Sequence, residues 1–530
     1  GIFQPVSREN HVEGQGCMTT FNKEVEKEVV IIGAGMGAMA TAARLGKKGY
    51  RVRVFEAGDR HGGKCRTEWI DGYAFDTGPS LLTLPAVYRD LFQRTGDVLG
   101  RVVEMTPVDP SFDYRFHDGT SVKFANLSRK KTLDAITSSY GAAAAAQWDQ
   151  IMRRAEAMWD VSREPFIESE LKSVASLFSR RTLLRDIFVI APWKSIRGLS
   201  IKSPHLRKIL DRYATYSGSD PRVAPAVLSS IAFVEEAFGA WHITGGIGKL
   251  GDALYQRCLD RRVTFEFNAH VDEITHEDGV VTGIALADGR HIPAHTVVAN
   301  ADAGTIYSHL IKNPPRSVRK AQRAIEKMEP SLAGFSLLLG LKPSAEPQLE
   351  HHTILFPENY DDEFEAIFNK KVPVEDPTIY ICAPHDETMV AKAGHQAWFV
   401  LVNAPRHGAD SFDWRDPVFA QQYAQKIIDR IEARGIKVRD RLDLLEIRTP
   451  ADLEASVLAP GGSIYGTSSN GARSAFNRAK NRSPLHGLYC VGGSAHPGGG
   501  LPLVGLSAEI VAEAILTRDG GGQLSSLDRH

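Results

Sequence analysis

Residues 29–38 read VVIIGAGMGA, a run of four apolar residues that enters a glycine-rich turn. A helical stretch follows over residues 39–49, and residues 51–56 form a second apolar segment that ends in Glu56. Strand, glycine turn, helix and strand in this order predict the βαβ unit of a Rossmann-type α/β fold.

Each small residue of this unit has a mechanical role in a dinucleotide site. Gly33 permits the tight turn, Gly35 lets a pyrophosphate approach the backbone, and Ala38 lets the helix pack closely on the strand. The carboxylate of Glu56 can accept hydrogen bonds from ribose hydroxyls and would repel a 2′-phosphate. The residues expected to hold the nucleotide are Gly33, Gly35, Met36, Gly37, Ala38 and Glu56. Such turns can also be purely structural, and the motif alone does not separate NAD from FAD.

The composition of the chain excludes several classes of protein. The length is enough for roughly three or four domain-sized units. The 63 Lys and Arg residues against 64 Asp and Glu residues give a formal charge of −1, which argues against a nucleic-acid partner. With 43% hydrophobic and 24% charged residues, the chain has the composition of a globular protein and not of a disordered one or a coiled coil.

Nothing in the sequence predicts a membrane span or a disulfide framework. The longest apolar runs, such as residues 333–341 and 187–193, are far shorter than the roughly 20 residues of a transmembrane helix. Five scattered cysteines without C-x-x-C spacing favour free thiols in a reducing compartment. Residues 1–23, which contain a possible start at Met18, are expected to be a leader that is disordered or was added to the natural chain.

Further glycine-rich segments separate the two candidate nucleotides. Residues 61–67 read HGGKCRT and residues 72–80 read GYAFDTGPS, for which an NAD dehydrogenase has no use. Residues 487–502 read GLYCVGGSAHPGGGLP, a short strand that enters a second glycine turn and then an apolar helix. With these segments the chain resembles the flavin-containing amine oxidase superfamily and, within it, the bacterial and fungal phytoene desaturase family of carotenoid desaturases.

The resemblance implies FAD as the cofactor and a glutathione-reductase-like, Rossmann-type FAD-binding domain beside a discontinuous α+β substrate domain. Residues 465–470 and 497–504 are similar to members that act on hydroxylated, methoxylated or partly desaturated carotenoids. Other matches are Trp241 with residues 245–250, residues 297–302, residues 351–356 and residues 376–380. The further FAD contacts implied are Gly62, Gly63, Lys64, Gly78, Pro79, Ser80, Val271, Gly493, Gly500, Leu501 and Pro502.

By this analogy the chain passes back and forth between two domains. We expect residues 24–90, 240–310 and 460–518 to build the FAD-binding domain. Residues 91–239 and 311–459 are then expected to build a substrate and membrane-associated domain.

Residues 172–208 are both basic and apolar. Nine Lys or Arg residues accompany a single acid, Asp186, among aliphatic and aromatic residues. The segment either lies in the headgroup region of a membrane, with Trp193 inserted, or is a solvated basic face over an ordinary core helix. A substrate that must be extracted from a bilayer favours the first interpretation, so we expect a cytoplasmic, peripherally membrane-associated protein.

A flavin without a thiol pair, a metal cluster or a hydrolase elbow predicts hydride transfer. N5 of FAD can accept a hydride from a carbon beside the polyene, and a proton then leaves the adjacent carbon, so that a double bond forms. The site is expected to be a long apolar tunnel that ends at the flavin. Candidates for its lining, each of a type more often found in the core, are Tyr213, Phe233, Trp241, Phe335 and Leu337.

Asp76, Asp302 and His496 are the candidate catalytic residues, because they lie in segments expected to approach the flavin. Groups of this kind also satisfy backbone amides in such loops. The pair His351 and His352 suggests metal ligands, but no further ligands stand at a matching spacing, so a structural role is favoured and no metal is expected.

Three alternatives remain open at this stage. An amine oxidase would share the nucleotide-binding ends, but its usual C-terminal aromatic pair is not evident at residues 492–506. A polyene isomerase or saturase would work from reduced FAD, and a non-enzymatic FAD-binding membrane scaffold would show no turnover. The electron acceptor, whether quinone, oxygen or a partner reductase, leaves no motif.

Overall fold

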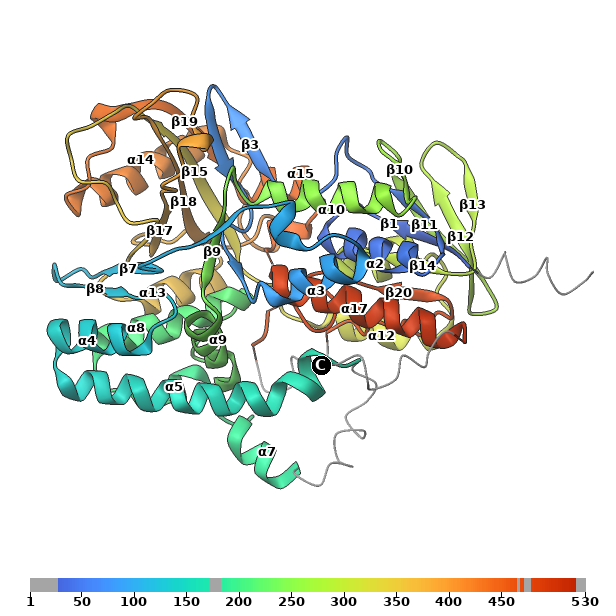
Figure 1. The fold of residues 1–530 in the computed structure, drawn as a ribbon, viewed down its shortest axis with the longest axis horizontal. Helices are drawn as coiled ribbons and strands as arrows, with labels where there is room; N and C mark the ends of the chain where they lie inside the picture. Colours follow the sequence, from blue (N-terminus) through green and yellow to red (C-terminus); the bar gives the residue numbers. More distant parts are fainter. Residues whose placement is uncertain (1–26, 171–182, 465–467, 471–477, 521–530) are drawn as a thin grey trace, which may run out of the picture.

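The computed structural model describes residues 27–170, 183–464, 468–470 and 478–520, and Figure 1 labels its elements. Three of the segments interpreted above lie wholly or partly outside these ranges. They are the leader at residues 1–23, residues 172–182 of the basic segment, and residues 465–467 of the segment that begins at Tyr465.

A five-stranded parallel sheet carries the first glycine motif. Its strands run in the order β10-β2-β1-β14-β20, and every neighbouring pair is parallel. The predicted βαβ unit is confirmed as β1 (Glu28–Ile32), α2 (Met36–Lys47) and β2 (Arg51–Phe55). The other strands are β10 (Thr264–Glu266), β14 (Val297–Ala299) and β20 (Leu488–Cys490).

Both faces of this sheet are covered, as its continuous apolar strands require. Val29 and Ile31 of β1 pack into a helical layer, whereas Val30 and Ile32 pack against a small antiparallel sheet. The helices of the layer are α2, α3 (Ala86–Thr95), α10 (Gly248–Asp260) and α17 (Leu501–Arg518). The antiparallel strands are β11 (Val271–Glu277), β12 (Val280–Leu286) and β13 (His291–Pro293).

Helix α2 begins at Met36, earlier than the predicted start at residue 39. Its first turn lies against the second glycine turn, because a Cβ on Gly37 would be 3.2 Å from the Cα of Gly492. Such an approach is possible only where the helix has no side chain. The sequence pattern missed this start because it followed the apolar periodicity and not the packing of the first turn.

A seven-stranded mixed sheet lies on the other side of the molecule, on the left in Figure 1. Its order is β19-β15-β18-β17-β16-β7-β8, with β16 and β7 parallel and the other pairs antiparallel. Helix α14 (Pro417–Ala433) covers one face, and the hairpin of β3 (Thr67–Ile70) and β4 (Tyr73–Asp76) packs on the opposite face. The strands are β7 (Phe112–Arg115), β8 (Ser121–Phe124), β15 (Ala333–Leu341), β16 (His352–Leu355), β17 (Ile379–Cys382), β18 (Gln396–Ala404) and β19 (Leu442–Arg448).

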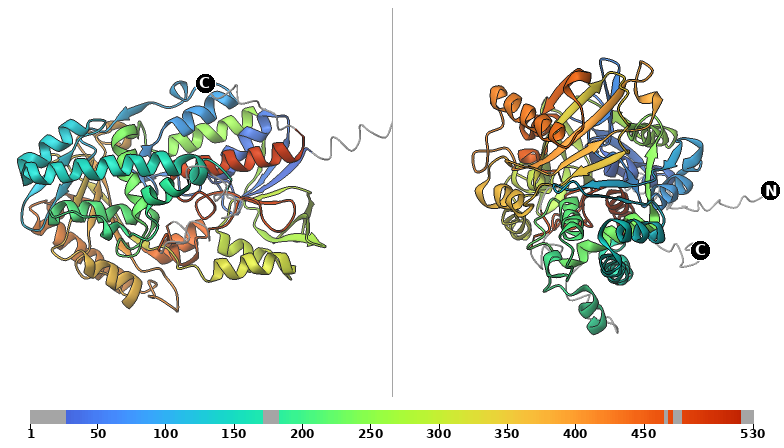
Figure 2. Two further views of the ribbon diagram at one scale, coloured as in Figure 1. Left: turned by 90° about the horizontal axis from the view of Figure 1, so that it is seen from below. Right: turned by 90° about the vertical axis from the view of Figure 1, so that its left-hand side faces the viewer.

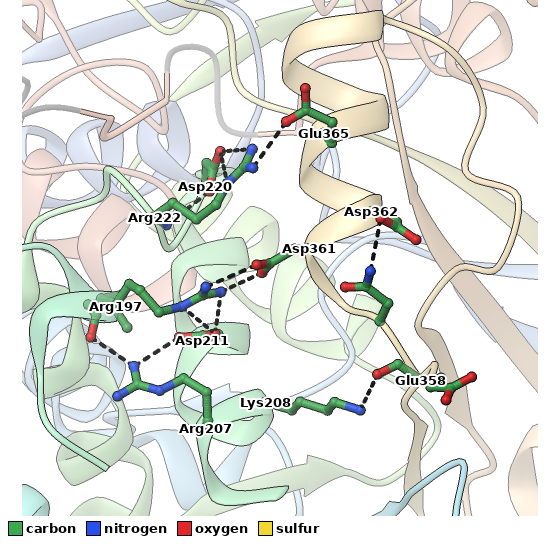
Figure 3. A network of polar contacts seen from close by, with 12 residues as sticks. Arg197, Arg207, Lys208, Asp211, Asp220, Arg222, Glu358, Asp361, Asp362 and Glu365 are labelled. Atoms are coloured by element: carbon green, nitrogen blue, oxygen red, sulfur yellow. Dashed lines mark hydrogen bonds and ion pairs between the residues drawn. The ribbon is translucent and has the colours of Figure 1, made fainter. Parts of the chain in front are cut away.

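A helical layer lies beside β7 and β8, and ion pairs tie it to the segment after β16 (Figure 3). Arg197 donates to both Asp211 of α8 and Asp361 of α13, and Arg222 donates to Glu365. Forked guanidinium contacts of this kind fix the relative orientation of segments more than they add stability. The helices are α4 (Arg129–Tyr140), α5 (Ala142–Ser162), α7 (Leu183–Ile190), α8 (Pro204–Arg212), α9 (Ser230–Phe238) and α13 (Asp361–Phe364).

Helix α7 projects away from this layer, as Figures 1 and 2 both show. The strands of the five-stranded sheet come from residues 24–90, 240–310 and 460–518, and those of the seven-stranded sheet from the rest of the described chain. The division into an FAD-binding and a substrate domain follows these sheets and stays a proposal. No described helix is both long and apolar enough to cross a membrane.

Candidate functional site

The first glycine turn lies against the end of β14. Gly33 has φ = +88°, and a Cβ there would be 2.8 Å from the backbone oxygen of Asn300. A Cβ on Gly35 would be 2.6 Å from the side-chain amide of Asn300. Glycine is therefore a steric requirement at position 33, where φ is positive and the contact is with backbone, whereas a Cβ at position 35 would require the side chain of Asn300 to move.

The N-terminus of α2 is open to a negatively charged ligand. Its N-cap is Gly35, which offers no side chain to cap the helix, and its first turn contains no acidic residue. Free N–H groups and the helix dipole together favour a phosphate at such an end. Gly500 is the N-cap of α17 in the same way, with Pro502 in a first turn that also lacks an acid. Each of the two predicted glycine turns therefore leads into a helix whose N-terminus can bind a phosphate of a dinucleotide.

The carboxylate of Glu56 lies beside the first turn, at the end of β2. Its Oε2 accepts a hydrogen bond from the N–H of Ala34 (2.7 Å), and its Oε1 accepts one from the N–H of Gly58 (3.0 Å). These bonds hold the carboxylate where ribose hydroxyls can donate to its remaining lone pairs. The backbone oxygen of Glu56 accepts a hydrogen bond from the N–H of Ala269 (2.8 Å). Val271, which starts β11, therefore lies near this end of β2.

The segment HGGKCRT packs directly on the first turn. The N–H of Gly62 donates to the backbone oxygen of Ala34 (2.8 Å). A Cβ on Gly63 would be 3.1 Å from the Cα of Gly35. The two glycine-rich segments thus form one backbone surface, although helix α2 and strand β2 separate them in the sequence.

Lys64 and Gly78 hold the next part of this surface. A Cβ on Gly78 would be 2.0 Å from the backbone oxygen of Lys64, so the two segments are in backbone contact. The Nζ of Lys64 donates to the backbone oxygen of Ile464 (2.8 Å). Burial lowers the pKa of Lys64, and the carboxylate of Asp302 opposes that shift. A negatively charged cofactor group would favour the charged lysine further.

Pro79 and Ser80 lead from this surface to the seven-stranded sheet. The Oγ of Ser80 and the hydroxyl of Tyr380 share a hydrogen bond (2.7 Å). Tyr380 also contacts Nδ1 of His352 (2.6 Å). Ser80 therefore lies where the proposed cofactor and substrate regions meet.

The third segment, residues 492–502, completes the site from the C-terminal end. Gly492 has φ = +108°, and the backbone oxygen of Gly493 accepts a hydrogen bond from Nη1 of Arg478 (2.7 Å). The backbone oxygen of Leu501 accepts one from the hydroxyl of Tyr88 (2.7 Å). Helix α17 packs on α2 and α3, so the start of α17 lies near the start of α2.

Two residues of this region were not among the predicted site residues. With its amide oxygen turned toward Gly35, Asn300 accepts from that N–H (3.3 Å) and donates to the backbone oxygen of Val491 (3.2 Å). Its place at the end of a third parallel strand is the signal that could have identified it. Arg478 is buried beside Asp302, and burial lowers its pKa to about 10. No sequence pattern marks Arg478, because it contacts the turn from a separate loop.

Asp76, a candidate catalytic residue, is buried at the end of β4. Its Oδ1 accepts hydrogen bonds from Oγ1 of Thr67 (2.7 Å) and from the N–H of Ile247 (3.0 Å). Burial raises its pKa to about 7, and the two hydrogen bonds oppose the shift. A carboxyl group with this pKa can exchange a proton near neutral pH.

The other two candidates, Asp302 and His496, have structural partners. The carboxylate of Asp302 accepts from the N–H groups of Gly304 and Thr305 and caps a short helix. The Nε2 of His496 lies 2.8 Å from the backbone oxygen of Ser169, and burial lowers the His496 pKa to about 4. Asp302 and His496 both lie near Arg478, whereas Asp76 lies at the start of α10. The structure thus places Asp302 and His496 near one another and Asp76 elsewhere.

The substrate candidates divide between two regions. Phe335 and Leu337 pack under α14, on the face of β15 that points away from β4. Alternate residues of a strand point to opposite faces, so these two side chains lie on the face away from β4, and their role in the tunnel stays a prediction. Leu338 instead packs with Tyr73 and Phe75 of β4.

The remaining substrate candidates lie in or beside the helical layer. The hydroxyl of Tyr213 donates to Glu235 (3.0 Å), and both are buried. Phe233 belongs to the same apolar cluster. Trp241 is half-buried on β9 (Ala240–Ile243), where its Nε1 donates to the backbone oxygen of Phe238 (2.9 Å).

Known proteins resemble this chain over most of its length. The family described as "Flavin containing amine oxidoreductase" matches residues 39–365. The 1-hydroxycarotenoid 3,4-desaturase of Flavobacterium sp. (strain P99-3) is 33% identical over 508 residues, which cover 92% of this chain and 99% of that protein. The 4,4'-diapolycopene oxygenase of a Methylomonas species is 29% identical, covering 93% of this chain and 99% of that protein.

Solved structures with the same fold include amine oxidases and a fatty acid isomerase from P. acnes (TM-score 0.56, 13% identity, covering 92% of this chain and 98% of the other). Wild-type putrescine oxidase bound to putrescine has a TM-score of 0.64 at 14% identity, covering 93% of this chain and 99% of the other. Cyclohexylamine oxidase from Brevibacterium oxydans IH-35A has a TM-score of 0.59 at 16% identity, with the same coverage. At such identities the likeness shows the fold alone.

The family match and the site agree on the cofactor. Two uncapped helix starts, a carboxylate at the end of β2 and the ammonium group of Lys64 fit a dinucleotide with a flavin, and FAD is the cofactor. The enzyme is an FAD-dependent oxidoreductase, and the chain belongs to the flavin containing amine oxidoreductase family.

Proposed function

We propose that this protein is a carotenoid desaturase, which introduces carbon–carbon double bonds into an acyclic carotenoid. The observation that supports this most is the match over nearly the whole chain, substrate region included, to a relative named for a carotenoid desaturation. Members named as oxygenases of diapolycopene and diaponeurosporene match over the same length. A long isoprenoid is therefore the substrate class, and its end group stays open among these relatives.

Bound FAD supplies the hydride acceptor for this chemistry. The protein must then hold the polyene, exclude water and take up a proton. We propose Asp76 as the proton-accepting group for two reasons. Its pKa is about 7, and hydrogen bonds from Thr67 and Ile247 hold its carboxylate in place. Asp302 and His496 are the second choice, since each already has a structural partner. The apolar cluster of Tyr73, Phe75 and Leu338 next to Asp76 is suited to exclude water.

We further propose that α7 and the turn after it lie on a membrane surface, where the substrate is dissolved. Leu184, Phe188 and Trp193 expose 75%, 70% and 59% of their surface, and α7 projects from the body of the protein. Exposed apolar side chains on a projecting helix beside cations suit the headgroup region. A quinone dissolved in the same membrane is the electron acceptor we propose, with oxygen as the alternative.

Liposome binding tests the membrane part of the proposal. The double variant Phe188→Ser and Trp193→Ser is expected to reduce co-sedimentation with anionic liposomes about tenfold, because it removes two exposed aromatic side chains that would insert into the membrane. The control is Val418→Ser, which removes an apolar residue that is 63% exposed on α14. Equal losses in both variants would contradict a specific role for α7.

An anaerobic titration tests the activity. FAD-loaded protein is mixed with liposomes that carry a panel of acyclic carotenoids, and in parallel with a panel of amines. Flavin bleaching with a red shift of the polyene spectrum is expected for at least one carotenoid. Bleaching by amines alone would make the protein an amine oxidase, as putrescine oxidase and cyclohexylamine oxidase are. If neither class bleaches the flavin, and the polyene changes only with reduced FAD, the protein is an isomerase or saturase.

A further inference from the structure

A cluster of nitrogen and sulfur ligands is buried where β16 meets β17. His351, His352 and Cys382 each place one ligand atom within 4.8 Å of the others. His352 and Cys382 face one another across the antiparallel pair, and the backbone oxygen of His351 accepts from the N–H of Ala383 (2.8 Å). The cluster is therefore built on a paired strand edge and not on a loose loop.

The imidazoles of this cluster carry nitrogen atoms that the described residues do not satisfy. Nε2 of His351 and Nε2 of His352 are buried and have no hydrogen-bond partner among the described residues. The two side chains belong to residues that are 7% and 0% exposed. Nδ1 of His242, whose ring lies 4.9 Å from that of His351, is in the same situation. Burial of unpaired imidazole nitrogens is unfavourable, so a ligand that bonds to them would stabilise this cluster.

The other nitrogen of His352 has the partner that a metal-bound imidazole needs. Nδ1 lies 2.6 Å from the hydroxyl of Tyr380, which in turn lies 2.7 Å from Oγ of Ser80. When Tyr380 donates to Ser80, Nδ1–H of His352 donates to Tyr380, and Nε2 keeps its lone pair for a ligand. Metal-binding histidines are held in this way by an outer hydrogen bond. With the opposite tautomer, Nε2 would be a buried donor without an acceptor.

We propose that His351, His352 and Cys382 bind a Zn²⁺ ion. Two imidazoles and one thiolate are donors that zinc prefers, whereas magnesium and calcium prefer oxygen. Zinc bonds of about 2.0–2.3 Å require the three side chains to close around the ion, which leaves a fourth position of the tetrahedron for solvent or for Nδ1 of His242. Binding displaces the thiol proton of Cys382 to solvent as the Zn–S bond forms.

The proposed ion would act as a structural clip beside the active site. It would join β16 to β17, and Cys382 packs with Tyr73 and Phe75 of β4, the strand that ends in Asp76. The inference does not depend on the identity of the carotenoid. It revises the interpretation of the histidine pair from the sequence, where the third ligand lies too far along the chain to be recognised.

Cobalt binding tests the site on the full-length, FAD-loaded protein. The protein is purified without a metal column, treated with a chelator and titrated with Co²⁺. We expect one ion per chain, with a thiolate-to-cobalt charge-transfer band that Zn²⁺ abolishes by displacement. Cys382→Ser is expected to remove the band, and His352→Gln to weaken binding at least tenfold. The control is Cys490→Ser, which changes another buried free cysteine and leaves the band intact.

Two results would overturn the proposal. The first is a wild-type protein that takes up no stoichiometric Co²⁺ or Zn²⁺, a result that does not depend on whether any variant folds. The second is a charge-transfer band that persists in Cys382→Ser or disappears in Cys490→Ser. FAD content and near-ultraviolet circular dichroism of each variant establish that it is folded before the titration is interpreted.

Discussion

The first glycine turn and the β16–β17 edge are built from different parts of the chain. At Gly33 and Gly35 the backbone itself forms the site, and an added Cβ would collide with Asn300. At His352 and Cys382 side chains from separate strands converge, and the two residues are a pair in ordinary antiparallel sheet. A turn formed by the backbone depends on residues that are adjacent in the sequence. A site formed by side chains can combine residues that are far apart in the sequence. The first kind is therefore visible in a sequence and the second is not.

The largest effect on FAD binding is expected where the backbone forms the site. Gly33→Ala combines a positive φ with a Cβ 2.8 Å from a backbone oxygen, so the turn must shift. FAD binding is expected to weaken about 100-fold or more, roughly 3 kcal/mol, measured by titrating the apoprotein with FAD. Gly119→Ala is the matched control, because Gly119 has φ = +84° but nothing within 4 Å of the added Cβ. Equal FAD affinity in both variants would contradict the steric requirement for glycine at position 33.

The second effect concerns the charge of Asp76. Because burial raises its pKa from 3.8 to about 7, its charged form is less stable in the folded protein than in the unfolded one. Its contribution to the free energy of unfolding is highest below pH 4. This contribution falls by about 4 kcal/mol in total as the pH rises through about 7. Asp76→Asn should remove this slope and keep the acceptor for Thr67 and Ile247.

Urea unfolding of FAD-loaded protein at several values of pH measures this difference. The same change at Asp97, whose side chain is 70% exposed, is the control. Parallel stability curves for wild type and Asp76→Asn would show that Asp76 is ionised at low cost, and it would then be a poor choice as proton acceptor.

The third effect compares adjacent residues of β15. Leu337 and Leu338 are both completely buried, but Leu337 faces α14 and Leu338 faces Tyr73 and Phe75. Each Leu→Ala change is expected to lower stability by about 2–5 kcal/mol. Only Leu338→Ala should also change the KM for the carotenoid, because only its face adjoins β4. A change in KM for Leu337→Ala alone would support the prediction that Leu337 lines the tunnel.

The smallest effect is expected at Glu56. Glu56→Gln keeps one oxygen as an acceptor for a backbone N–H but loses the charge and the second acceptor oxygen. FAD affinity is expected to fall about tenfold, or 1.4 kcal/mol. A titration that shows no change would mean that the ribose is held by other groups.

The sequence predicted well what depends on neighbouring residues. The βαβ unit, β20 with its glycine turn, and α17 formed where the patterns placed them, because strand and helix periods and glycine turns are local properties. The role of Phe335 and Leu337 in the tunnel stays a prediction, since alternation defines two faces of β15 but not which of them meets β4. Asn300 and Arg478 were missed for a related reason, because each meets a glycine turn only after distant segments have packed.

The most direct test of the proposed desaturase is an anaerobic single turnover followed by mass spectrometry. FAD-loaded protein in liposomes is given an acyclic carotenoid without oxygen, and both the flavin spectrum and the mass of the carotenoid are followed. The account predicts a product that lacks two hydrogen atoms, formed in the same amount as reduced flavin. A carotenoid that stays unchanged until oxygen is admitted and then gains an oxygen atom would contradict it.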